Sequence, residues 1–134
     1  MTSRQMLVWL LRMAGAAMLC ALAFVFCPFA PMAAIHRWLG LGELAYTPLL
    51  SYLIRSVSAL YAIVGAVLVC VSFDPHRYRP LILLLGVAAA LGGVGVTILD
   101  SVLRLPWFWT VVEGPSTVLL GVALLVLVRG MRTP

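Results

Sequence analysis

Residues 81–103 read LILLLGVAAALGGVGVTILDSVL, and this stretch contains a single charged side chain, that of Asp100. A helix needs about 20 consecutive apolar residues to cross the hydrocarbon core of a bilayer. Three further stretches of this kind lie at residues 6–26, 48–73 and 111–128. The sequence therefore predicts one integral membrane domain over residues 1–134, an all-α bundle of four transmembrane helices.

The composition excludes several classes of protein. The chain has 134 residues, of which 64% are hydrophobic and 10% charged, whereas soluble domains are about 45–50% apolar and about 25% charged. A soluble enzyme domain and a disordered tail are therefore excluded. The net charge is +5, but the arginines are dispersed and form no basic face for nucleic acid. The three cysteines lie in apolar stretches without the spacing of metal ligands, so we expect no metal site.

Prolines and one threonine mark the predicted helix boundaries. Pro28 and Pro31 are expected to end the first helix, and Pro106 and Pro115 to bracket the loop before the fourth. Thr47 is expected to cap the start of the second helix. A polar hairpin turn at residues 74–80 is expected to join the second helix to the third.

The segment at residues 31–46 carries its own pattern. Apolar residues recur there at helical spacing, while two basic residues fall off the apolar stripe: the stripe is Met32, Ile35, Trp38 and Leu39, and the basic residues are His36 and Arg37. This predicts a short amphipathic helix on the outer membrane surface. The alternative is an ordinary loop in which the periodicity arises by chance.

The distribution of arginine predicts the orientation of the chain. Basic residues collect on the cytoplasmic side of membrane proteins. The side that carries both termini holds most of them: Arg4, Arg12, Arg77, Arg79, Arg129 and Arg132. The opposite side is rich in aromatic residues, as expected for an interfacial belt. We therefore expect cytoplasmic termini and, for a bacterial protein, a place in the inner membrane.

Among the charged residues inside the predicted spans, three lie at similar depth in the outer leaflet: Arg55, Asp100 and Glu113. A charge in hydrocarbon is costly and needs a partner or a polar cavity. Each shares a helix face with small residues, among them Ser58, Thr97 and Thr117. Because small residues mark contacts between membrane helices, we expect the arginine to meet the two carboxylates.

This cluster has two interpretations, which the sequence leaves open. The first is a structural ion network that holds the helices together. The second is a polar pocket that binds the head group of a small amphipathic ligand such as a lipid or quinone. Four outer residues are candidates to cover the cluster: His36, Glu43, Trp107 and Trp109.

The chain resembles the DoxX-like group of small four-helix membrane proteins. The resemblance covers nearly the whole chain and rests on RSVSALY at residues 55–61, RYRP at residues 77–80, Asp100, and EGP at residues 113–115. Some members of that group are similar to subunits associated with quinone-linked oxidoreductases. The resemblance therefore implies the four-helix fold more than any activity.

No common catalytic motif occurs in the chain, and no cofactor is expected beyond a bound lipid or quinone. We therefore expect a non-enzymatic accessory or scaffold subunit, with membrane lipids and other membrane subunits, or copies of itself, as partners. The first alternative is a binder of an amphipathic ligand. The second is an enzyme on a lipidic substrate, with Glu113 and Asp100 as acid and base.

Overall fold

The computed structural model describes residues 2–131, and no strand occurs among them. The helices, in chain order, are α1 (Ser3–Leu19), α2 (Leu22–Phe26), α3 (Phe29–Trp38), α4 (Pro48–Val71), α5 (Arg79–Val102) and α6 (Trp107–Arg129). Four segments are long and apolar enough to cross a membrane: Ser3–Phe26, α4, α5 and α6. The predicted all-α class with four membrane-spanning helices is confirmed. Arg132, one of the basic residues on the predicted cytoplasmic side, lies outside the described residues.

The first span is interrupted, although the sequence predicts one continuous helix there. α1 ends at Leu19 and α2 begins at Leu22, with Cys20 and Ala21 in a turn between them. The backbone N–H of Ala21 donates to the Met18 carbonyl at 3.1 Å, three residues back instead of four. Such tighter turns often mark a change in helix direction. Neither turn residue is Gly or Pro, so no local signal in the sequence marks the interruption.

The predicted start of the fourth span is wrong. α6 begins at Trp107, directly after Pro106, and Pro115 lies inside the helix instead of bracketing a loop. A proline ring removes only one backbone hydrogen bond, that to the carbonyl four residues earlier. Membrane helices tolerate this loss because neighbouring groups can bond the freed carbonyl. The aromatic residues at 107–109 therefore form the first turn of α6.

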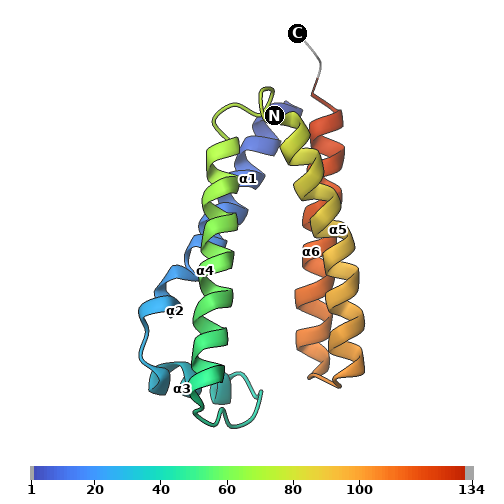
Figure 1. The fold of residues 1–134 in the computed structure, drawn as a ribbon. Coiled ribbons are helices and arrows are strands. Elements are labelled where there is room, and N and C mark those ends of the chain that lie inside the picture. The colour runs from blue at the N-terminus through green and yellow to red at the C-terminus, as the bar shows by residue number, and fades with distance from the viewer. Residues whose placement is uncertain (1, 132–134) are drawn as a thin grey trace. The chain divides into compact units, whose positions relative to one another are not determined.

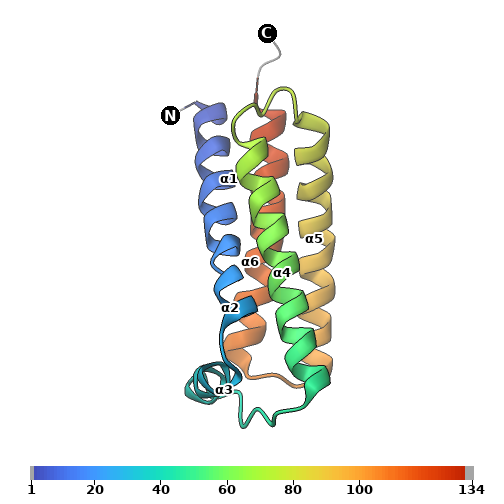
Figure 2. The same ribbon diagram turned by 60° about the vertical axis from the view of Figure 1, so that its left-hand side comes forward.

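The predicted amphipathic helix exists as α3, which begins at Phe29, two residues before the predicted segment. Pro28 precedes its first turn and Pro31 lies within it, so Pro31 does not end the first helix. Met32 is buried, but Ile35 and Trp38 are exposed. In Figure 2, α3 lies below α2 and is joined to the lower end of α4 by the loop that follows it. Its place on the membrane surface stays a prediction.

The chain divides into two compact units. Residues 11–70 form the first, here called the α4 unit, and residues 1–10 with 71–134 form the second, here called the α5–α6 unit. In the α4 unit, α1 packs against α4 through Gly15 and Gly65. A Cβ at Gly15 would lie 2.8 Å from the Gly65 carbonyl oxygen, so only glycine permits this approach.

In the α5–α6 unit, α5 and α6 run side by side along their length (Figure 1). Gly86 and Gly93 of α5 face Gly121 and Gly114 of α6, and all four are buried. A Cβ at Gly93 would lie 2.7 Å from the Gly114 carbonyl oxygen, and one at Gly121 would lie 2.6 Å from the Gly86 carbonyl oxygen. The predicted small-residue stripe of α5 therefore packs against α6.

The start of α1 belongs to the same unit as the end of α6. A Cβ built at Gly130 would lie 3.2 Å from the Ser3 hydroxyl oxygen. The first and last turns of the described chain are therefore at one end of this unit. This agrees with the expectation that the two termini share one side of the membrane.

Substitution of Gly121 by Ala is expected to destabilise the protein, because the new methyl group meets backbone atoms of α5 that cannot rotate away. Overpacking of this kind costs about 1–3 kcal/mol. The matched control is Gly95→Ala, where a Cβ would meet nothing within 4 Å and where alanine favours the helix by up to about 1 kcal/mol. Thermal unfolding in detergent micelles measures both effects. Equal shifts in the two variants would contradict the packing described here.

Candidate functional site

Arg55 lies in the third turn of α4, about 10 Å along the helix axis from Pro48 at 1.5 Å per residue. The start of the helix is fixed by Thr47, whose hydroxyl oxygen accepts a hydrogen bond from the Leu50 N–H at 3.0 Å. This confirms the predicted cap. The cap therefore sets how deep along α4 the guanidinium lies.

The guanidinium of Arg55 bonds backbone carbonyls within its own unit. Nη1 donates to the Val25 carbonyl oxygen at 2.5 Å, and Nη2 donates to the Cys27 carbonyl oxygen at 3.0 Å. Nε is 3.4 Å from the Ser51 hydroxyl oxygen, a longer and weaker contact. All three nitrogens of the planar group are thus directed at the end of the first span or at α4 itself.

These carbonyls need a donor because of how the first span ends. α2 stops at Phe26, so the Val25 carbonyl lies in its last turn and the Cys27 carbonyl lies beyond it, and neither has a donor from a continuing helix. In hydrocarbon, an unpaired backbone group costs several kcal/mol. Arg55 supplies the missing donors from a neighbouring helix. The sequence pattern led us to expect carboxylate partners for this residue and gave no sign of the carbonyls at the end of α2.

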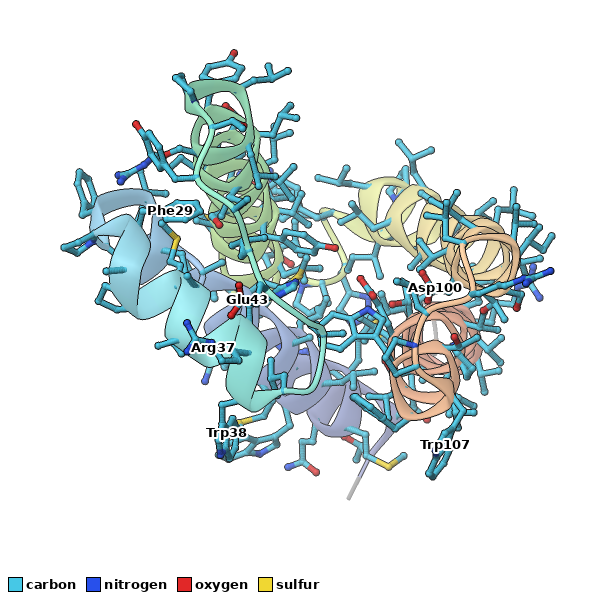
Figure 3. All side chains as sticks on the ribbon, turned by 90° about the horizontal axis from the view of Figure 1, so that it is seen from below. Phe29, Arg37, Trp38, Glu43, Asp100 and Trp107 are labelled. Carbon is cyan, nitrogen blue, oxygen red and sulfur yellow. The ribbon has the colours of Figure 1, made fainter. Side chains whose placement is uncertain are left out.

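Asp100 is the buried acidic residue of the α5–α6 unit. It lies in the last turn of α5, is 4% exposed, and its Oδ2 has no hydrogen-bond partner among the described residues. Figure 3 shows it beside the turn that joins α5 to α6. The Thr97 hydroxyl lies one turn earlier but donates to the Gly93 carbonyl oxygen at 2.8 Å. The buried Oδ2 thus lacks a donor from the described part of its own unit.

Glu113 is displaced from its predicted position by the early start of α6. The sequence predicts it in the first turn of the helix, but it lies in the second, and its side chain is half-buried. The face of α6 that packs on α5 begins at the next residue, Gly114, which the sequence pattern did not single out. The Thr117 hydroxyl donates to the Glu113 carbonyl oxygen at 2.9 Å. The Thr117 hydroxyl therefore donates to its own helix, and its part in the predicted cluster stays a prediction.

The four residues expected to cover the cluster differ in their surroundings. His36 Nδ1 donates to the Gly42 carbonyl oxygen at 3.1 Å, which leaves Nε2 as the acceptor of the ring. Glu43 comes next in the same loop and is exposed. Trp107 is 78% exposed and points away from α6 in Figure 3, whereas Trp109 is half-buried. Their role as a cover stays a prediction.

The expected meeting of charges also stays a prediction. Arg55 and Ser58 belong to the α4 unit, whereas Asp100 and Glu113 belong to the α5–α6 unit. Both Arg55 and Asp100 have hydrogen-bonding groups that are not used within their own units. The guanidinium has five N–H groups, of which three are directed at the Ser51 hydroxyl and the two carbonyls, and the Asp100 carboxyl has an unpaired oxygen.

A double-mutant cycle between Arg55→Met and Asp100→Asn tests whether the two groups interact. We expect Arg55→Met alone to cost about 3 kcal/mol, because it leaves the Val25 and Cys27 carbonyls without their donors. We expect Asp100→Asn to cost less once Arg55 is absent, with a coupling of at least about 1 kcal/mol. Unfolding in micelles titrated with a denaturing detergent measures each variant.

The control for the cycle is Ser51→Ala, which removes only the long contact of Nε. Strict additivity of the two main substitutions would show that Arg55 acts through the carbonyls of the first span alone.

Comparison of the chain with protein-family models, curated proteins and solved structures gives no match. Among residues 2–131, no group of three or more His, Cys, Asp or Glu side chains is placed to hold a metal ion. The chain is a membrane protein by its four long apolar helices, and its similarity to the DoxX-like group stays a prediction.

Proposed function

We propose that this chain is a small non-enzymatic membrane subunit that acts by binding other membrane helices, as an accessory or scaffold component of a larger complex. The observation that carries the proposal is a second small-residue face on α5. Its members are Ala88, Gly92 and Gly95, and all three are exposed. No atom lies within 4 Å of a Cβ built at Gly92 or at Gly95.

A glycine lowers the stability of a helix but permits a second helix to approach it closely. A glycine within a helix costs about 1 kcal/mol relative to alanine. At Gly86 and Gly93 this cost is offset by close packing against α6. At Gly92 and Gly95 nothing in the described part of the α5–α6 unit offsets it. Since small residues allow membrane helices to approach closely, the open face suits a helix of another subunit.

The polar residues inside the spans support association over catalysis. Arg55 bonds backbone carbonyls and so has a structural use. The hydroxyls of Thr97 and Thr117 bond carbonyls of their own helices. The segments between the spanning helices α4, α5 and α6 are short turns. The surface that the described residues offer to a partner is thus mostly helix.

Gly92→Leu and Gly95→Leu are expected to release partner subunits while leaving the fold intact, because each leucine blocks the close approach of a second helix without meeting an atom of its own chain. The measurement is purification of the tagged chain in a mild detergent, followed by quantification of the membrane proteins that it retains. The matched control is Val94→Leu, an exposed position on another side of α5.

Two outcomes would contradict the proposal. One is retention of the same partners by all three variants. The other is a fall in the thermal stability of Gly92→Leu purified alone, which would show that a helix of the same chain occupies this face.

A second candidate function is favoured by Asp100. Its buried Oδ2 has no partner among the described residues and suits the head group of an amphipathic ligand that donates a hydrogen bond to it, a lipid or a quinone in its reduced quinol form. The residue lies at the end of α5 that is expected to face outward, so a head group at the membrane surface reaches this depth with its apolar tail in hydrocarbon.

Asp100→Asn is expected to reduce the amount of bound lipid or quinone seen by native mass spectrometry, because an amide replaces the carboxyl acceptor. Asp74→Asn is the control, since Asp74 is exposed in the turn before α5 and accepts a hydrogen bond from the Arg77 N–H at 3.2 Å. Equal ligand content in both variants would exclude Asp100 as the binding group.

A further inference from the structure

Residues 22–38, which comprise α2 and α3, are attached to the rest of the α4 unit by few contacts. α2 has no buried residue, and α3 has one, Met32. The segment begins directly after the turn at Cys20 and Ala21, and the N–H groups of Ala21 and Ala23 bond carbonyls only three residues back. A loop at residues 39–47 comes after it. The segment, here called the strap, therefore has an irregular connection at each end.

The polar and aromatic contacts of the strap fall into two groups. The first ties it to the loop at residues 39–47. The Phe29 ring packs edge-on against Tyr46, with centroids 5.0 Å apart, and His36 donates to the Gly42 carbonyl oxygen. The second ties it to α4 and consists of the two hydrogen bonds from Arg55. In the described part of the chain, Arg55 is the side chain of α4 that hydrogen-bonds the strap.

We propose that residues 22–38 form a hinged strap, that Arg55 latches it to α4, and that opening of this latch is a conformational step of the protein. The inference does not depend on the proposed function, because it concerns only contacts within the α4 unit. When the guanidinium is removed or engaged elsewhere, the Val25 and Cys27 carbonyls lose their donors. Since unpaired carbonyls are costly in hydrocarbon, the strap then moves to where water or lipid head groups bond them.

Arg55 is better suited to act as a latch than an apolar side chain at this position would be. Its two hydrogen bonds are directional and charge-assisted, and they break together when the guanidinium turns. They also engage backbone atoms, so the latch does not depend on side-chain packing in α2. An open strap would uncover the guanidinium and the neighbouring Ser51 hydroxyl for another acceptor.

The chain carries its own reporters of this opening. Cys27 provides one of the latched carbonyls and is half-buried, whereas Cys70 is exposed near the other end of α4. Two single-cysteine backgrounds separate them, one that retains Cys27 and one that retains Cys70, with alanine at the other cysteines. The rate of alkylation by N-ethylmaleimide is then measured in lipid nanodiscs.

In the Cys27 background, Arg55→Met is expected to raise the alkylation rate about tenfold, the effect of losing a hydrogen bond to a charged group. Arg55→Lys is expected to give a smaller increase, because an ammonium group lacks the planar fork that reaches both carbonyls. Ser51→Ala is the matched control and is expected to leave the rate within about twofold, since it removes only the long contact of Nε. The Cys70 rate is expected to change by less than about twofold in all variants, because Cys70 does not contact the latch.

An unchanged Cys27 rate in Arg55→Met, or an equal rise at Cys70, would overturn the proposal. If Arg55→Met does not fold, Arg55→Lys decides in the same way. Hydrogen exchange of the unaltered chain gives an independent test. Residues 22–38 are expected to exchange faster than the middle of α4, and equally slow exchange of the two segments would also overturn the latch.

Discussion

A backbone carbonyl that enters hydrocarbon must find a donor, and in the α4 unit that donor comes from a different helix. The first span stops at Phe26, which leaves the Val25 and Cys27 carbonyls without donors from a continuing helix. Arg55 fills the gap from α4. The hydrogen bonds between the guanidinium and these carbonyls thus reduce both the cost of burying the charge and the cost of ending a helix inside the membrane. This explains why an arginine lies deep in an otherwise apolar helix.

The glycines determine how closely the helices of each unit approach one another. Where α1 meets α4 and where α5 meets α6, glycines face each other and a single added methyl group would meet backbone atoms. α5 carries glycines on a second face as well, and there the space stays open. One helix therefore combines a face that stabilises its own hairpin with a face of glycines that no side chain approaches closely in the described residues.

The parts of the structure that hydropathy controls can be predicted from the sequence. The second and third spans end within two residues of their predicted limits, and the spacing of Met32 and its neighbours indicates α3. The interruption at Cys20 cannot be predicted, because it has no Gly or Pro signal. Proline tolerance depends on the surroundings of the helix, so the sequence predicts that α6 begins near residue 111 instead of at Trp107, and it places Glu113 one turn too early in the helix. The partners of Arg55 are carbonyls, which every residue has and which sequence patterns therefore do not reveal.

Pro115 gives α6 a property that the other spans lack. Without the proline N–H, the Val111 carbonyl has no donor four residues ahead, so one link is missing between the first two turns and the remainder of the helix. Those turns carry the aromatic residues at 107–109, which favour the boundary between lipid and water. The missing link therefore lies between the aromatic end of α6 and the part that packs on α5, and a proline at such a point is a common place for a helix to bend.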